Sequence, residues 1–146
     1  VRGAVMEGAS VLLGGEPQPG PGNFYPATVL RDVRHESEIS KHEIFGPVVC
    51  VYTMNDLDEA IAQANSLEVA FQAAVFTQDI DLALRVGRRI DASAVMVNDH
   101  TAFRVDGMPF AGLRQSGLGV GGIPFTIHDM QIEKMLVVKS GELGTF

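Results

Sequence analysis

The chain has 146 residues, a formal net charge of −7 at pH 7, and a hydrophobic content of 46%. This length is enough for one compact domain with its own core. The acidic balance argues against nucleic acids and anionic membrane surfaces as partners, because both require a basic face. The single cysteine excludes an internal disulfide bond and a cysteine-rich metal site, so we expect a reducing, cytoplasmic location.

Neither a membrane anchor nor a secretion signal is indicated. No apolar run reaches the length of a membrane span, and the N-terminus lacks the pattern of a signal peptide. The first residue is Val1 rather than methionine, which suggests a fragment or a processed product.

The N-terminal third predicts a short helix followed by strands. Residues 1–8 have the apolar spacing of a helix end, and residues 10–13 and 24–30 have strand composition. The next strand, at 48–52, is an unbroken and largely β-branched apolar run. A run this short and apolar predicts a strand buried on both faces.

Strands and helices then alternate. A helix capped by Asn55 follows the apolar strand, and a second helix capped by Asp79 separates strands at 73–77 and 94–98. This order predicts βαβ crossovers. The expected fold is therefore α/β: an open parallel sheet with helices on both faces, forming three layers.

The pattern changes after residue 98. Residues 99–122 have the composition of a long loop, and residues 123–130 are compatible with a short helix. Residues 133–139 read as one more strand, which need not join the main sheet.

One motif leads to a family. The stretch Glu43-Ile44-Phe45-Gly46-Pro47-Val48-Val49 resembles the signature of the NAD(P)-dependent aldehyde dehydrogenase superfamily, in the C-terminal part of its catalytic domain. Further fragments resemble that family in the same order and spacing, and they lie at 29–33, 58–61, 64–65, 75–79, 97–98, 108–112 and 116–119.

The resemblance implies an incomplete enzyme. It assigns residues 1–130 to the C-terminal portion of the catalytic domain and 131–146 to an oligomerisation strand and tail. The family's nucleophilic cysteine, its general base and its dinucleotide-binding domain all precede the matched part. We therefore expect a parent enzyme that oxidises an aldehyde to an acid through a thioester with NAD or NADP, and a fragment that is inactive alone.

The same resemblance assigns four contact residues and no catalytic or metal-binding residue. Glu43 matches the carboxylate that accepts hydrogen bonds from the nicotinamide ribose, and Phe45 matches the aromatic beside the nicotinamide. Phe110 matches an aromatic of the aldehyde tunnel, and Arg104 lies in the loop that shapes substrate choice, where it could hold an anionic tail. The alternatives are that Glu43 is an anchor, that Phe45 is a core residue, and that Arg104 pairs with Asp106.

Three departures from the family pattern are visible. His42 stands where many members have a second glutamate, and Ala111 replaces a glycine of Pro-Phe-Gly-Gly. Val69-Ala70-Phe71 stands where Tyr-Gly-Leu is usual, so a turn is expected to be remodelled. None of the three removes a residue expected to do chemistry.

Two other patterns suggest chemistry but have simpler explanations. Cys50 lies inside the apolar strand, where a thiol stays neutral and inert. A Gly-x-Gly-x-x-Gly pattern occurs at 117–122, but no strand–helix context for dinucleotide binding surrounds it. These glycines are expected in a loop that needs positive φ angles. His35 and His42 are expected at the surface, without a neighbouring metal ligand.

The substrate expectation is narrower than the family. Residues 98–108 look most like branches that act on small functionalised aldehydes, such as lactaldehyde, phosphonoacetaldehyde or glyceraldehyde 3-phosphate. A homo-oligomer through the C-terminal strand is the expected assembly. The competing class is a non-catalytic module that only self-associates. A phosphate-reducing relative of the superfamily is disfavoured by the intact Glu-Ile-Phe-Gly-Pro.

Overall fold

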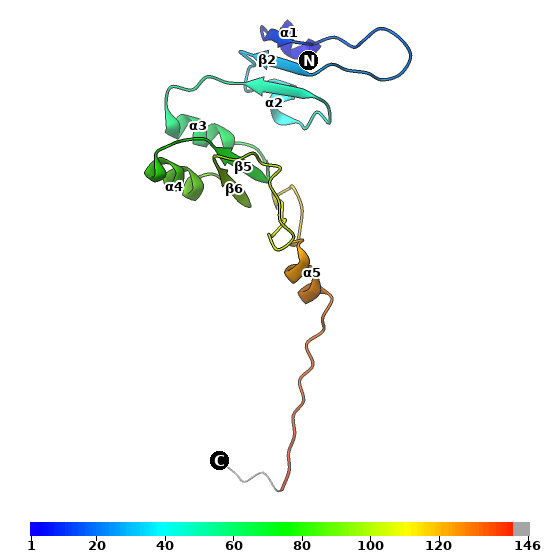
Figure 1. Cartoon of the computed structure of the whole chain (residues 1–146), viewed down its shortest axis with the longest axis vertical. Coiled ribbons are helices and arrows are strands. Elements are labelled where there is room, and N and C mark those ends of the chain that lie inside the picture. The colour runs from blue at the N-terminus through cyan, green and yellow to red at the C-terminus, as the bar shows by residue number, and fades with distance from the viewer. Residues whose placement is uncertain (142–146) are drawn as a thin grey trace. The chain divides into compact units, whose positions relative to one another are not determined.

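The computed structural model describes residues 1–141. The chain divides into two units, and several of their elements are labelled in Figure 1. The first unit extends from Val1 to Gln63, and the second begins at Ala64. The elements up to this boundary are α1 (Arg2–Met6), β1 (Ser10–Leu13), β2 (Thr28–Arg31), α2 (Glu38–Lys41), β3 (Val48–Val51) and α3 (Leu57–Ala64).

The first unit is built on a sheet with the strand order β1-β2-β3. β1 runs antiparallel to β2, and β2 runs parallel to β3 with Thr28 opposite Val48. β2 starts later than the expected residue 24. Pro26 has no N–H for a ladder, and its carbonyl instead accepts a hydrogen bond from the Thr28 hydroxyl at 3.0 Å.

The hydrophobic core of this unit lies on one face of the sheet. Ala4 of α1, Leu30 of β2 and Val33 are buried together, with Ile39 of α2 and Cys50 of β3 packed against them. Helices α1 and α2 therefore contribute to the same core as β2 and β3. Leu30 is completely buried.

The expectation that the apolar strand is buried on both faces is wrong for this chain. Side chains alternate along a strand, so Val48 and Cys50 point to the core side, whereas Val49 and Val51 point away from it. Val49 is 59% exposed and Val51 is 42% exposed. The helices of this unit cover only one face of β3.

Helix α3 begins at Leu57, and its cap lies one residue later than the predicted Asn55. The Asp56 carboxylate, rather than the Asn55 side chain, accepts hydrogen bonds from the backbone N–H groups of Asp58 at 2.6 Å and Glu59 at 3.1 Å. Either residue type is a good N-cap, so the sequence alone did not separate them.

The second unit contains β4 (Val69–Ala70), β5 (Gln72–Val75), α4 (Ile80–Arg89), β6 (Ala94–Val97), β7 (Leu113–Arg114) and α5 (Ile123–Asp129). β5 and β6 are parallel, with Gln72 opposite Ala94, and α4 connects them. This confirms the βαβ unit predicted around α4, whereas β3 and β5 belong to separate sheets. The Asp79 carboxylate caps α4 as expected, accepting hydrogen bonds from the N–H groups of Asp81 and Leu82.

The Asn98 side chain forms hydrogen bonds that link the C-terminal ends of β5 and β6. Its side-chain oxygen accepts a hydrogen bond from the Thr77 N–H at 2.8 Å, and its side-chain nitrogen donates to the Thr77 carbonyl at 2.9 Å. Asn98 has a φ of +58°, a left-handed conformation that asparagine adopts more readily than most residues. The long loop that carries Arg104 therefore starts from a fixed point.

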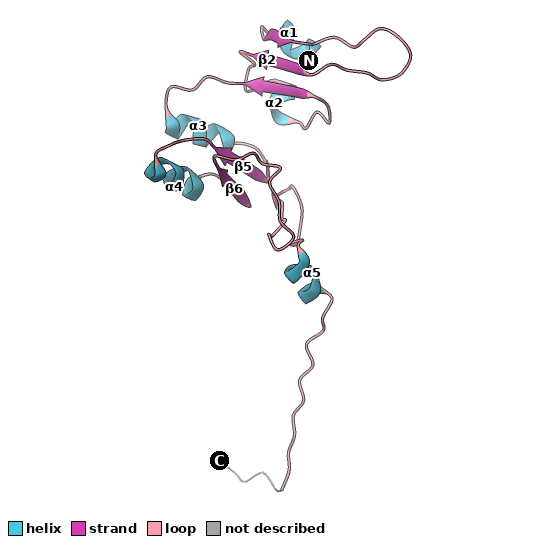
Figure 2. Cartoon of the chain, in the orientation of Figure 1, coloured by secondary structure: helices cyan, strands magenta, loops and turns pink. Residues whose placement is uncertain are grey.

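Arg114 joins segments that are far apart in the chain. Its guanidinium donates hydrogen bonds to the carbonyls of Asn65 and Leu67 and to the Asp91 carboxylate. The adjoining two-residue strands β4 and β7 pair antiparallel, with Val69 opposite Arg114. These contacts hold the segment between β6 and α5 against residues 65–70 and Asp91. In Figure 2 this segment is mostly loop.

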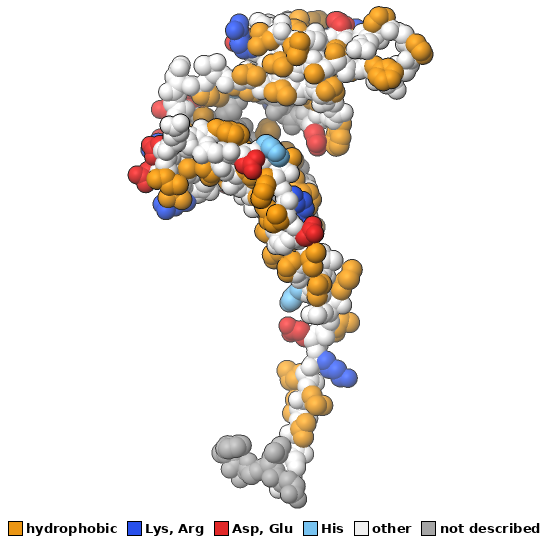
Figure 3. All heavy atoms as spheres, viewed as in Figure 1, with side chains coloured by type: hydrophobic (Ala, Val, Ile, Leu, Met, Phe, Trp, Pro, Cys, Tyr) orange, Lys and Arg blue, Asp and Glu red, His pale blue; other side chains and the backbone are white. Residues whose placement is uncertain are grey.

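The expected strand at residues 133–139 does not form in this chain. Within residues 1–141 this segment pairs with no strand, and its side chains are exposed. Met135, Leu136 and Val137 are each at least 80% exposed, and hydrophobic side chains are spread along this tail in Figure 3. The remainder of the expected tail, residues 142–146, lies outside the described residues.

The α/β class with open sheets is confirmed. The parallel pairs β2–β3 and β5–β6 belong to separate sheets. Among the helices of residues 1–141, none combines the length and apolarity that crossing a membrane requires.

Candidate cofactor and substrate sites

The signature motif forms the loop between α2 and β3. Glu43 and Phe45 are both exposed, and Phe45 is 88% exposed. The loop is fixed where it meets the sheet, because the Thr28 N–H donates to the Pro47 carbonyl at 2.8 Å. Phe45 is therefore not a core residue of this chain.

The Glu43 carboxylate is available to a ligand. Within the described part of the chain it takes part in no hydrogen bond or ion pair, whereas the neighbouring His42 lies 3.1 Å from Glu38. An ionised carboxylate has two oxygens that accept hydrogen bonds and suits a pair of adjacent hydroxyl groups. The anchor alternative for Glu43 has no contact to support it in residues 1–141.

Phe45 adopts an uncommon backbone conformation. Its φ is +51°, in the left-handed region that bulky side chains rarely occupy. Such residues cost on the order of 1–3 kcal/mol and cluster at binding sites and ligand clamps. The loop thus holds an exposed aromatic ring and a free carboxylate next to a strained backbone position.

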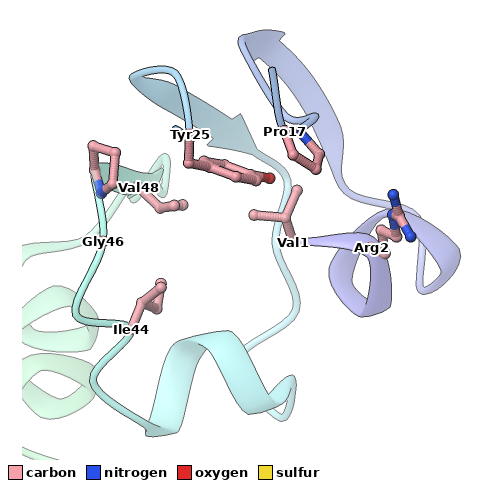
Figure 4. A pocket seen from close by; sticks show the side chains of 8 residues that line it. Val1, Arg2, Pro17, Tyr25, Ile44, Gly46 and Val48 are labelled. Atoms are coloured by element: carbon pink, nitrogen blue, oxygen red, sulfur yellow. The ribbon is translucent and has the colours of Figure 1, made fainter. Parts of the chain in front are cut away.

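An open apolar pocket of about 410 Å³ lies beside this loop (Figure 4). Ile44 and Val48 lie on one side of the pocket and Val1 on the other, with the Tyr25 ring between Val48 and Val1. Pro47 also lines the pocket. Glu43 and Phe45 are not among its lining residues. The pocket is therefore adjacent to the candidate cofactor contacts and does not contain them.

The second unit brings the two candidate substrate residues into contact. The Arg104 Cζ atom lies 4.4 Å from the centre of the Phe110 ring. A guanidinium over an aromatic face is a cation–π contact, which orients the cation without neutralising it. No ion pair joins Arg104 to Asp106 in residues 1–141, so the alternative partner is not used.

A second aromatic residue, Phe71, completes this group. The Phe71 and Phe110 rings meet edge to face, with 4.8 Å between centres and an interplanar angle of 84°. Phe71 is not among the residues to which the sequence assigns a functional role. The signal that could have found it is its position in the segment that departs from Tyr-Gly-Leu.

The glycines of the Gly-x-Gly-x-x-Gly pattern support a tight loop. Gly119 and Gly122 have φ angles of +79° and +113°. A Cβ on Gly122 would lie 2.6 Å from the Met108 carbonyl oxygen, so only glycine fits there. The strand before the pattern, β7, is antiparallel to β4 and not part of a βαβ unit. The geometry fits the loop explanation.

Cys50 occupies a structural position. It is the only cysteine of the chain and packs against the core of the first unit. Burial raises the pKa of the Cys50 thiol, although a hydrogen bond with Tyr52 acts in the opposite direction. A raised pKa leaves less thiolate at neutral pH, which disfavours nucleophilic attack by this residue.

The candidate residues thus form two local pairs. Glu43 and Phe45 share one loop of the first unit, and Arg104 and Phe110 are in contact in the second. Residues 1–141 contain no group of three or more histidine, cysteine, aspartate or glutamate side chains that could hold a metal ion. His35 is exposed and stacks on Tyr52, as expected for a surface histidine.

Comparison with known proteins gives the family. The sequence profile described as "Aldehyde dehydrogenase family" matches residues 1–136. The chain belongs to the aldehyde dehydrogenase family.

Three relatives define the extent of the similarity. The chain is 43% identical over 136 residues to aspartate-semialdehyde dehydrogenase 1 of Pseudomonas canavaninivorans, covering 93% of this chain and 28% of that protein. Aldehyde dehydrogenase 21 from Physcomitrella patens, solved in complex with the reaction product succinate, has 35% identity and a TM-score of 0.87, with 99% of this chain and 29% of that one covered. The NAD+ complex of an aldehyde dehydrogenase from Bacillus cereus has 35% identity and a TM-score of 0.81, covering 86% and 26%. The chain thus spans less than a third of the length of each relative.

Proposed function

We propose that this chain is the C-terminal part of an NAD(P)-dependent aldehyde dehydrogenase that oxidises an aldehyde with an anionic tail to the carboxylic acid. The observation that carries the anionic tail is the Arg104 guanidinium, which rests on the Phe110 ring and forms no ion pair with Asp106. Such a guanidinium keeps its charge available and can bind a carboxylate, phosphonate or phosphate with two hydrogen bonds.

Two of these relatives support this substrate class. Aspartate semialdehyde, in the name of the Pseudomonas relative, carries a carboxylate. Succinate, the product bound in the Physcomitrella structure, keeps one carboxylate at the end remote from the oxidised carbon. Phosphonoacetaldehyde and glyceraldehyde 3-phosphate share the anionic tail, whereas lactaldehyde is neutral and offers Arg104 no anion to bind.

The exposed residues of the signature loop fit a nicotinamide cofactor. In the proposal, the Glu43 carboxylate accepts hydrogen bonds from two ribose hydroxyls, and the Phe45 ring packs beside the nicotinamide and excludes water. When bound, the cofactor accepts a hydride from the substrate. The contribution of this chain is to orient the nicotinamide riboside. NAD and NADP are both compatible with these two contacts.

We propose that the chain alone has no activity. The reaction requires a thiolate nucleophile and a base that activates water, and the only thiol in the chain is Cys50, whose pKa is raised by burial. In the proposal, the nucleophile and the base belong to a preceding part of the parent enzyme. Residues 1–130 then complete its catalytic domain.

Mixing the purified chain with NAD or NADP and a panel of aldehydes is expected to give no sustained formation of reduced cofactor. Absorbance of the reduced nicotinamide is the measurement, and Cys50→Ala is the matched control. Turnover by the wild-type chain that Cys50→Ala abolishes would make Cys50 the nucleophile and refute the proposal.

The exposed tail favours self-association as a second property of the chain. Leu136, Val137 and Val138 are exposed and apolar, and Lys134 and Lys139 flank them. An unpaired apolar segment is normally covered by a partner. We propose that residues 131–146 form an oligomerisation strand and tail that pairs with another subunit. A purely structural, self-associating module would use the same segment without any catalysis.

We also propose a cytoplasmic location for the parent enzyme.

Leu136→Pro is expected to weaken this assembly. Proline removes a backbone donor and cannot continue a paired strand, so the variant should shift from oligomer to monomer. Light scattering of the wild-type chain and the variant at equal concentration measures the change. Gly141→Pro, placed beyond the apolar segment, is the control and should behave like the wild type. A wild-type chain that is already monomeric, with Leu136→Pro indistinguishable from it, would contradict the assignment.

A further inference from the structure

Phe71 lies far from Arg104 in the sequence, but both side chains contact Phe110. Its ring meets Phe110 edge to face, and Phe110 carries the Arg104 guanidinium on its face. Edge-to-face pairs contribute about 0.5–1.5 kcal/mol beyond the area they bury. The orientation of the Phe110 ring therefore depends partly on Phe71.

The backbones beneath both rings are held in place. The Phe71 carbonyl accepts hydrogen bonds from the Ser93 N–H at 2.7 Å and from the Ser93 hydroxyl at 2.8 Å. Phe110 exchanges two hydrogen bonds with Gly121, of 2.9 and 2.7 Å. Neither backbone can shift without breaking these bonds. The two rings are therefore held in fixed positions, and the flexible Arg104 side chain packs on one of them.

We propose that Phe71 is a positioning residue for Arg104 and raises the preference of the enzyme for anionic over neutral aldehydes. This inference rests on the proposed function, because it assumes that Arg104 binds the anionic tail. Arginine has several rotatable bonds, and a guanidinium that is already oriented loses less entropy when it binds a ligand. The segment 69–71 departs from Tyr-Gly-Leu, and a leucine at position 71 has no ring edge to offer Phe110.

The positioning role and simple packing predict different effects on stability and on substrate preference. Phe71 is only partly buried, so its replacement by leucine keeps most of the apolar contact. If Phe71 only fills space, the substitution lowers stability and leaves substrate preference unchanged. If it orients Arg104 through Phe110, the substitution raises KM for anionic aldehydes and leaves KM for neutral aldehydes and kcat for both nearly unchanged.

The first test is spectroscopic and uses the chain itself. A guanidinium above an aromatic face experiences the ring current, so the Arg104 side-chain proton resonances should lie upfield of those of the other arginines. Phe110→Leu should abolish the upfield shift, Phe71→Leu should reduce it, and Phe71→Tyr should preserve it. Unchanged Arg104 resonances in a folded Phe71→Leu chain would overturn the inference without any reference to activity.

The second test is kinetic and needs a complete enzyme. The matching C-terminal part of the Pseudomonas relative is replaced by this chain, and the preference for an anionic over a neutral aldehyde of equal size is measured. Phe71→Leu should lower this preference by about twofold to tenfold through KM, the equivalent of one edge-to-face pair, and Phe71→Tyr should restore it. If Arg104→Ala lowers the preference and Phe71→Leu does not, the inference is wrong and the proposed function stands. If Arg104→Ala leaves the preference unchanged, the proposed function itself is refuted, and this inference with it.

Discussion

In a complete enzyme containing this chain, Arg104→Ala is expected to lower kcat/KM for an aldehyde with an anionic tail by roughly tenfold to a hundredfold, since a hydrogen bond to a charged group contributes about 1.5–3 kcal/mol. The same substitution should change kcat/KM for a neutral aldehyde of similar size by less than about threefold. Phe110 holds the guanidinium by its face and leaves the N–H groups at its edge free to donate.

Two variants separate charge from shape in this experiment. Arg104→Lys keeps the positive charge but loses the planar fork, so an intermediate loss on the anionic aldehyde is expected. Arg88→Ala changes an exposed arginine on α4 and should affect neither substrate. Equal losses on anionic and neutral aldehydes with Arg104→Ala would contradict a role in reading charge.

Glu43→Gln in the same enzyme is expected to lower the rate of hydride transfer by about tenfold to a hundredfold. The substitution preserves the shape of the side chain and removes its charge, so the ribose hydroxyls lose a charge-assisted acceptor worth about 1.5–3 kcal/mol. Single-turnover kinetics measures this step, because it isolates chemistry from product release.

The control for Glu43 is Glu38, in helix α2 just before the signature loop. Glu38→Gln removes a carboxylate that lies near His42 and is not proposed to contact the cofactor. It should leave hydride transfer unchanged. A Glu43→Gln enzyme with normal kinetics and a shifted melting temperature would instead support the role of a structural anchor.

Elements with strong local signals were predictable from the sequence. β1 and α4 lie where composition and the Asp79 cap predict them. The two-residue strands β4 and β7 were not predictable, because each is stabilised only by the other, and Val69 and Arg114 are brought together by the chain between them. The prediction that β3 is buried on both faces was also wrong, because the composition of a strand does not show whether other elements of the chain pack on each of its faces.

The sequence proposes the candidate residues but not their contacts. The signature motif proposes Glu43 and Phe45, the match to Pro-Phe-Gly-Gly proposes Phe110, and the loop position proposes Arg104. That Arg104 rests on Phe110 rather than pairing with Asp106 depends on how the loop closes onto Gly121 and Gly122. The contact between Phe71 and Phe110 could not be found from spacing, because it depends on long-range packing.

The most direct measurement of the central claim is cofactor reduction by a chimera. In this protein the present chain replaces the matching C-terminal part of the Pseudomonas relative, which is 43% identical over 136 residues. We expect the chimera to reduce NAD or NADP with a carboxylate-bearing aldehyde, the isolated chain not to do so, and Glu43→Gln to slow the chimera. A soluble, folded chimera that shows no turnover with any aldehyde, while the unmodified relative is active in the same assay, would contradict the claim that this chain supplies the cofactor and substrate contacts of an aldehyde dehydrogenase.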